Sequence, residues 1–202
     1  KTAKAAKHHH RLVVIASLSR FDETRADQSV DRLPIAGPFG MPTLNLNAAA
    51  WGRVMRSFAD ELHAWRRHER VIAIAHVGLR SGQVKEADVL DVGLMRVSPR
   101  WIPLDSSYEG TIEEKLCQAS RKFEKPLRFD ADEAEVFPDF WLFDAGKDYP
   151  LEVFGMATND YLARRDHKTA WYNAKYGVAG WWHWDAASDP GAQRIPPFPD
   201  PL

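Results

Sequence analysis

Short apolar runs alternate with one long amphipathic stretch in the N-terminal half of the chain. Residues 11–18 (RLVVIASL) and 71–79 (VIAIAHVGL) are rich in β-branched residues and bounded by polar ones, which predicts buried strands. The prolines and glycines of residues 22–47 predict a long irregular connection between them. From about residue 48 the apolar positions recur every three or four residues, which predicts a helix with the apolar face Trp51, Val54, Met55, Phe58, Leu62 and Trp65. Residues 84–97 fit either another strand or a short helix.

The C-terminal half shows the order helix, hairpin, helix. A helix is predicted from Ser106 to about residue 123, followed by strands at 140–143 (FWLF) and 150–154 (PLEVF) around the turn DAGKDY. A second helix is predicted from 159 to about 176, with Asn159 as its N-cap. With the strands of the first half, this order predicts an α/β or α+β fold. The chain is accordingly divided into an N-terminal α/β module (1–100), a C-terminal domain (101–185) and a proline-rich extended tail (186–202).

Composition places the chain among globular proteins. It has 202 residues, 45% of them hydrophobic, and a formal net charge of -1, which excludes a mainly disordered chain and a protein that coats nucleic acid by bulk charge. The single cysteine, Cys117, excludes an internal disulfide framework. No apolar run approaches the roughly 20 residues that a membrane helix needs. We therefore expect a cytoplasmic protein with no membrane partner.

Two carboxylates lie on the predicted C-terminal hairpin. We expect Phe143 to pair with Pro150. Trp141 then stands opposite Glu152, with Asp139 as the diagonal neighbour of Glu152 on the same face. Diagonal neighbours are about 7–8 Å apart, close enough for two carboxylates to share one hard cation such as Mg²⁺ or Mn²⁺. A shift of one residue in the register would place them on opposite faces.

Cations follow the hairpin on the helix predicted at 159–176. Positions three or four residues apart form one stripe of this helix, which holds Tyr161, Arg164, Lys168, Tyr172 and Lys175. Lys168 is expected to return over Glu152, where an ammonium can polarise a water or neutralise developing negative charge. Arg164 and Lys175 are expected to hold phosphates beside it, and Tyr172 to position the nucleic-acid backbone.

These motifs resemble the PD-(D/E)xK nuclease superfamily, which has the restriction-endonuclease-like fold. The residues that carry the resemblance are Asp139, directly after Pro138, and Glu152 on the following strand. The chain departs from the motif at Phe154, where the superfamily has its lysine. Some members carry that lysine on the next helix instead, and Lys168 fits this migrated position.

The resemblance spans about residues 101–176 and implies a metal-dependent DNA endonuclease, with a central mixed sheet flanked by helices. Asp139 and Glu152 would then bind Mg²⁺ or Mn²⁺. Such families often have a glutamate on the preceding helix, for which Glu109 is the best match and Glu113 the second. Residues 138–156 and the helix after them also resemble uncharacterised proteins of bacterial conjugative and integrative elements. This likeness implies transferred DNA as the substrate, with a second copy of the chain or conjugation-complex proteins as further partners.

The carboxylates and Lys168 also have structural interpretations. Ser106 and Glu109 form a capping box, in which Glu109 reaches back to the Ser106 N–H. Asp139 after Pro138 fits the turn that begins a strand. Lys168 fits a solvated helix face.

For three further residues the sequence also leaves both a structural and a functional role open. Arg121 and Lys122 belong to a basic run that either contacts backbone phosphates or ends a solvated helix. His183, flanked by two tryptophans, either packs in the core or stacks on a base.

Two other functions compete with the nuclease. A nuclease-fold protein that binds DNA as a scaffold without cleaving it is suggested by Phe154 in the position of the motif lysine. A protein–protein module built on the tryptophan-rich C-terminus is the third candidate, and it predicts no salt-dependent DNA binding.

Overall fold

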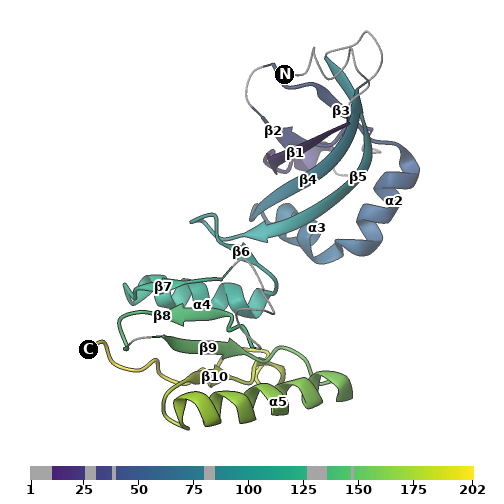
Figure 1. The fold of residues 1–202 in the computed structure, drawn as a ribbon. Helices are drawn as coiled ribbons and strands as arrows, with labels where there is room; N and C mark the ends of the chain where they lie inside the picture. Colours follow the sequence, from purple (N-terminus) through teal and green to yellow (C-terminus); the bar gives the residue numbers. More distant parts are fainter. Residues whose placement is uncertain (1–10, 26–30, 38–39, 80–84, 127–135, 147) are drawn as a thin grey trace. The chain divides into compact units, whose positions relative to one another are not determined.

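The computed structural model of the chain describes residues 11–25, 31–37, 40–79, 85–126, 136–146 and 148–202. The chain divides into two units, Lys1–Pro103 (unit 1) and Leu104–Leu202 (unit 2). Each unit combines a sheet with helices, so the fold is α+β, as the sequence predicted (Figure 1).

Unit 1 contains a sheet in the strand order β2-β1-β4-β5-β3. Its strands are β1 (Arg11–Leu18), β2 (Ile35–Ala36), β3 (Thr43–Asn45), β4 (Arg70–Leu79) and β5 (Glu86–Val97). Neighbouring strands are antiparallel except β3, which runs parallel to β5. Alternate residues of β4 are buried in one core, as a sheet with one covered face requires: Val71, Ala73, Ala75 and Val77. The strands predicted at 11–18 and 71–79 are confirmed, and residues 86–97 form a strand rather than a helix.

The helix predicted from residue 48 is two helices, α2 (Ala48–Ser57) and α3 (Ala59–Arg66). Asn47 caps α2, since its side-chain oxygen accepts from the Ala50 N–H at 2.8 Å. The chain leaves helical geometry at Phe58, with φ -132° and ψ 41°. After this break α3 contacts both β4 and β5, whereas α2 packs against β5. A short 3-10 turn, η1 (Glu23–Arg25), lies in the predicted irregular connection.

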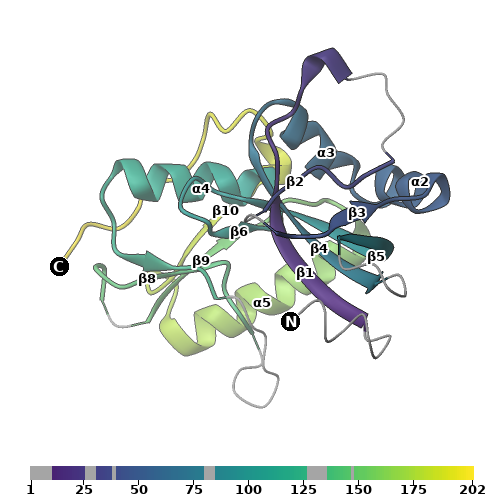
Figure 2. The ribbon, with the colours of Figure 1, turned by 90° about the horizontal axis from the view of Figure 1, so that it is seen from above.

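Unit 2 contains a mixed sheet in the order β10-β9-β8-β7. After β6 (Pro103–Leu104), at the chain's passage between the units, the order of elements is α4 (Ser107–Gln118), β7 (Phe123–Glu124), β8 (Phe140–Leu142), β9 (Tyr149–Val153), α5 (Asn159–Tyr176), β10 (Trp182–Trp184) and the 3-10 turn η2 (Ala186–Ser188). Strands β7, β8 and β9 are antiparallel, whereas β10 runs parallel to β9 with α5 as the crossover. Helices α4 and α5 lie on opposite sides of the sheet (Figure 2).

Alternation along β9 separates two environments. Leu151 and Val153 pack with Ile112 of α4 in an apolar core. Glu152 and Phe154 belong to the other face, where Phe154 packs with Tyr172 of α5. The α4 side is therefore hydrophobic, and the α5 side carries the acidic residue.

Both helices of unit 2 differ from prediction at one end. Helix α4 stops at Gln118 rather than near residue 123, because Ser120 takes a left-handed φ of 53° and the chain then enters β7. The N-cap of α5 is Thr158, not Asn159, and its side chain makes no capping hydrogen bond. Gly177, with a φ of 77°, ends α5 in a conformation that costs glycine little. None of the helices in the described ranges has both the length and the apolar character to cross a membrane.

The proline-rich tail belongs to unit 2 instead of forming a separate extended segment. Phe198 packs against Trp182, whose indole N–H donates to the Pro197 carbonyl at 3.1 Å. The Leu202 N–H donates to the Asp144 carbonyl at 2.8 Å. The tail has few apolar residues, but these contacts order it along the surface of its own unit.

Candidate active site

The β8–β9 hairpin has a register two residues away from the predicted one. Phe140 pairs with Leu151 and Trp141 with Pro150, so the expected pairing of Trp141 with Glu152 is wrong. A shift of two residues keeps each side chain on its face, because the period of a strand is two. Continued by one residue, this register places Asp139 directly opposite Glu152.

Long-range contacts explain the register. Arg121 donates to both oxygens of Asp144, at 2.7–3.1 Å, and the Lys122 N–H donates to the same carboxylate at 2.9 Å. The Phe143 N–H donates to the Lys122 carbonyl at 2.8 Å. These bonds fix the residue at which the connection between β8 and β9 begins. The residues of the turn alone do not determine that position.

Asp139 is held at the start of β8 by two backbone bonds to β9. Its N–H donates to the Leu151 carbonyl at 3.1 Å, and its Oδ2 accepts from the Val153 N–H at 2.7 Å. Burial, then the charges of Glu152 and Glu109, raise the pKa of Asp139 to about 8, against the opposing effects of the Val153 N–H and Lys168. A proton or another cation at this position is therefore favourable.

Glu152 lies at the centre of this site and is 2% exposed. The Lys168 ammonium is 2.8 Å and 3.0 Å from its two oxygens, and the Tyr172 hydroxyl donates to Oε1 at 2.7 Å. Burial raises the pKa of Glu152 even though Lys168 and Tyr172 lower it. The expected return of Lys168 over Glu152 is confirmed. Lys168 also donates to the Phe137 carbonyl at 3.1 Å and stays 32% exposed, so its ammonium faces both the acidic pair and solvent.

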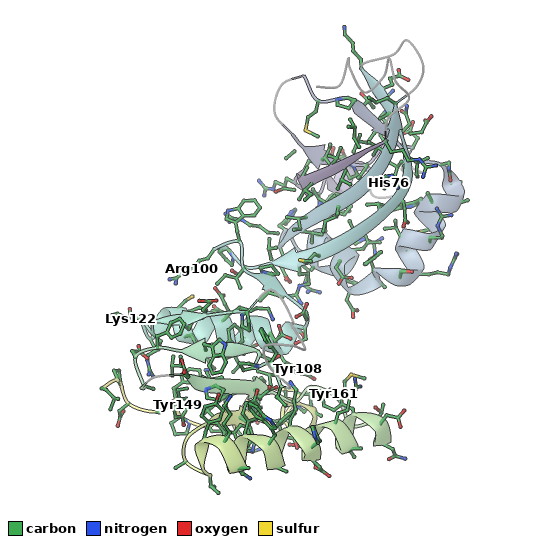
Figure 3. All side chains as sticks on the ribbon, viewed as in Figure 1. His76, Arg100, Tyr108, Lys122, Tyr149 and Tyr161 are labelled. Carbon is green, nitrogen blue, oxygen red and sulfur yellow. The ribbon has the colours of Figure 1, made fainter. Side chains whose placement is uncertain are left out.

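Gly155 allows the chain to leave β9 between two tyrosines. A Cβ at this position would lie 3.1 Å from the ring of Tyr108 on α4. Its N–H donates at 3.2 Å to the hydroxyl of Tyr161, the α5 residue labelled in Figure 3. The glycine is therefore needed for close packing beside Glu152.

Glu109 is occupied by structural contacts. The Ser106 hydroxyl accepts from the Glu109 N–H at 3.1 Å, and Glu109 Oε2 accepts from the Asp105 N–H at 3.2 Å rather than from that of Ser106. The buried Lys125 ammonium lies 2.6 Å from the same oxygen. Glu109 thus caps α4 and acts on Asp139 and Glu152 through its charge.

Glu113, the second match for the helix glutamate, is buried one turn further along α4. Its Oε1 accepts from the Cys117 thiol at 3.3 Å. Of the two helix glutamates, Glu109 is the one whose charge raises the pKa of Asp139 and of Glu152.

Two of the five residues expected to bind nucleic acid are buried instead. Tyr172 is fully buried against Glu152, and the Arg121 side chain is 6% exposed in its ion pair with Asp144. Neither can reach a phosphate, so the phosphate-contact prediction is wrong for both. The neighbouring sequence does not reveal either partner, because Glu152 lies 20 residues from Tyr172 and Asp144 lies 23 residues from Arg121.

The other three are exposed cations. Lys122 lies at the surface just before β7 (Figure 3). On α5, the Arg164 guanidinium lies 5.6 Å from the ring centre of Tyr161, and the Lys175 ammonium 4.5 Å from that of Trp171. Arg164 and Lys175 lie on either side of Lys168 along α5, and all three exposed cations are open to a polyanion.

His183 lies beside the acidic pair and was left undecided by the sequence. It pairs with Glu152 across the β9–β10 ladder and is exposed, while Trp181 and Trp184 are buried. Burial of part of the ring, and the Arg165 charge, lower the pKa of His183 against the opposing effect of Asp185. The sequence could have placed His183 beside Glu152 only through a prediction that residues 182–184 form a strand parallel to β9. That prediction needs α5 to be recognised as the crossover between the two strands.

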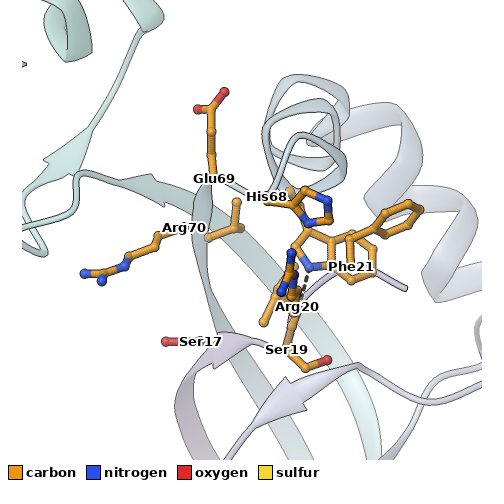
Figure 4. Close-up of a pocket in the computed structure, with 10 residues that line it drawn as sticks. Ser17, Ser19, Arg20, Phe21, His68, Glu69 and Arg70 are labelled. Carbon is orange, nitrogen blue, oxygen red and sulfur yellow. Dashed lines mark hydrogen bonds between the residues drawn. The ribbon is translucent and has the colours of Figure 1, made fainter. Parts of the chain in front are cut away.

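Unit 1 has a separate cavity of about 350 Å³ at the end of β1 and the start of β4 (Figure 4). Its polar groups are largely engaged: the Trp65 indole N–H donates to the Ser19 carbonyl at 2.6 Å, and Glu69 binds Arg67 and Arg96. Arg70, which also lines the cavity, has its guanidinium over the Trp101 ring, 4.9 Å from the ring centre. This cavity offers less available chemistry than the acidic pair of unit 2.

Comparison with known proteins identifies the family. Residues 1–187 match the profile of a family described as a protein of unknown function (DUF1173). The chain belongs to the DUF1173 family. No curated protein and no solved structure matches it. Among the described residues of this DUF1173 chain, no group of three or more His, Cys, Asp or Glu side chains is arranged to hold a metal ion.

Proposed function

We propose that unit 2 is a metal-dependent DNA endonuclease with a restriction-endonuclease-like core, which hydrolyses phosphodiester bonds at Asp139 and Glu152. The observation that carries the proposal is the placement of these two carboxylates on neighbouring strands with the Lys168 ammonium on Glu152. The mixed sheet between α4 and α5 agrees with such a core. The proposed substrate is mobile-element or transferred DNA in the cytoplasm.

The acidic pair fits a divalent cation. Lys168 neutralises one carboxylate, and burial with the neighbouring charges raises the pKa of Asp139, so a metal cation bound there would take the place of a proton. Asp139 and Glu152 would hold it, and Mg²⁺ typically needs only one or two carboxylates because it keeps several waters. Bound Mg²⁺ or Mn²⁺ would polarise the phosphoryl oxygens and lower the pKa of a water.

The protein's own groups supply orientation and charge. Tyr172 and Lys168 fix the Glu152 carboxylate by three hydrogen bonds. Because Lys168 is part-exposed, its ammonium can also donate to a phosphate oxygen as negative charge develops on it. Arg164 and Lys175 would hold the flanking phosphates from the same helix.

The test is a cleavage assay on supercoiled plasmid and single-stranded DNA with Mn²⁺ or Mg²⁺. Glu152→Gln keeps the shape of the side chain but removes its charge, so we expect at least a roughly 100-fold loss of cleavage. The matched control is Glu114→Gln, an exposed carboxylate on α4. Cleavage that persists in Glu152→Gln would show that the site is wrong.

A scaffold that binds DNA without cleaving it is the second candidate. Phe154 in place of the motif lysine favours it, because Lys168 is then only the partner of a buried carboxylate. This candidate predicts equal DNA binding with and without a chelator and no cleavage with any divalent metal. A second copy or a conjugation-complex protein would be its further partner.

A further inference from the structure

We propose that His183 forms a stacking site for an unpaired nucleobase beside the acidic pair, so that the substrate is single-stranded DNA. The inference rests on the proposed function for its placement next to the reacting phosphate. It adds a recognition element on β10 to the carboxylates of β8 and β9.

Three rings form a stack that leads from the buried site to the surface. Tyr172, which binds Glu152, stacks on Trp181 with ring centres 4.9 Å apart and an interplanar angle of 22°. Trp181 stacks on His183 at 4.6 Å and 24°. Tyr172 and Trp181 are buried and His183 is exposed, so an aromatic ligand can continue the stack only at His183.

Trp181 holds this stack in a fixed orientation. Its indole N–H donates to the Asn173 side chain of α5 at 2.8 Å. The ring of Phe154 supports His183 from the side, with ring centres 5.9 Å apart. The imidazole is thus oriented before a ligand arrives, which reduces the entropy lost on binding.

The position of His183 places such a base close to the proposed chemistry. His183 pairs with Glu152 in the β9–β10 register, and neighbouring strands are about 4.8 Å apart. Arg165 and Asp185, which pair at 3.2 Å, both act on the pKa of His183, which Asp185 raises and Arg165, more weakly, lowers. An exposed flat ring fits the face of a base, and the exposed cations Arg164 and Lys175 of α5 would contact the phosphates of the same strand.

A base in a duplex cannot use this site. It is paired and stacked on both sides, and extruding it costs a few kcal/mol. An unpaired base next to the reacting phosphate has no such cost. The ring stack therefore favours single-stranded DNA over a duplex of the same sequence.

The experiment measures binding without cleavage. In EDTA, fluorescence anisotropy gives the affinity of a labelled dT12 strand and of a 12-mer abasic strand with the same phosphates. His183→Ala should weaken dT12 binding by at least about five-fold and leave the abasic strand unchanged, because base–aromatic stacking contributes about 1 kcal/mol or more. His183→Phe, which keeps a flat ring, should retain the dT12 affinity. His63→Ala, at an exposed histidine of unit 1, is the matched control.

Equal losses on both strands, or no loss on either, would overturn the stacking site. So would a His183→Phe variant as weak as His183→Ala. If His183→Ala fails to fold by thermal denaturation, His183→Gln removes the ring while keeping a polar side chain, and the same comparison applies. Binding that depends on the ring, without cleavage in any metal, would contradict the nuclease and support the base-stacking site. Cleavage by the wild type, with DNA binding unchanged in His183→Ala, would support the nuclease and contradict the base-stacking site.

Discussion

The raised pKa of Asp139 predicts an unusual pH dependence of stability for the metal-free protein. The folded protein holds a proton up to about pH 8, whereas the unfolded chain releases it near the ordinary value of 3.8. Between these values the folded state binds more protons than the unfolded state. The free energy of unfolding contributed by Asp139 is therefore greatest below pH 3.8, falls as the pH rises, and stops falling above about pH 8.

Asp139→Asn isolates this effect. The amide oxygen can still accept from the Val153 N–H, which Asp139 Oδ2 does now at 2.7 Å. One proton corresponds to about 1.4 kcal/mol per pH unit, so the wild type should lose up to about 2.5 kcal/mol between pH 5 and pH 7. The variant should lose much less over the same range, and it should be the more stable protein at pH 8.

Urea denaturation in EDTA at pH 5 to 9 measures the difference. Tryptophan fluorescence reports mainly on unit 2, which contains Trp141, Trp171, Trp181, Trp182 and Trp184. Asp160→Asn, at an exposed aspartate of the same unit, is the control for a general change of charge. Parallel pH profiles of wild type and Asp139→Asn would refute the raised pKa of Asp139. Adding Mn²⁺ at pH 8 should stabilise the wild type more than the variant, since only the wild type offers both carboxylates.

Two further variants test the surroundings of the site. Tyr172→Phe leaves Glu152 without the 2.7 Å hydroxyl bond and should lower the free energy of unfolding by about 1–2 kcal/mol, measured by urea denaturation; an unchanged midpoint would show that the bond contributes nothing. Arg121→Ala should cost about 2 kcal/mol or more because it strands the Asp144 carboxylate, whereas the exposed Lys122→Ala should change stability by less than about 0.5 kcal/mol. Equal effects of the two substitutions would contradict a structural role for Arg121.

Local patterns predicted the strands and the main faces well. Residues 11–18 and 71–79 carry β-branched runs, and both are strands in the structure. The stripe on α5 correctly placed Lys168 over Glu152, because the helix period is a local property. The break at Phe58 has no local signal, since no glycine or proline is present there, and it coincides with the point beyond which the helix also contacts β4.

Features that depend on distant partners escaped the sequence. The hairpin register was misassigned by two residues because Arg121 and Lys122 hold Asp144 from outside the hairpin. Tyr172 was expected to meet nucleic acid, but the fold turns it inward onto Glu152. The sequence indicates no partner for Lys125, three residues after Lys122, and only the tertiary structure reveals that its ammonium pairs with Glu109.

The arrangement around Lys168 offers a way to distinguish the proposed enzyme from the proposed scaffold. A buried ion pair kept only for structure needs one acid and one base, and such a pair is often replaceable by apolar residues without loss of stability. Here Lys168 binds Glu152 through both oxygens, yet the backbone holds a second carboxylate, Asp139, on the facing strand. Burial, and after it the charges of Glu152 and Glu109, raise the pKa of Asp139 to about 8, so the metal-free folded protein keeps this carboxyl protonated at pH 7. A divalent cation held by both acids would replace that proton, so the proposed nuclease should release a proton from Asp139 when Mn²⁺ binds, whereas a scaffold that binds no metal should keep it.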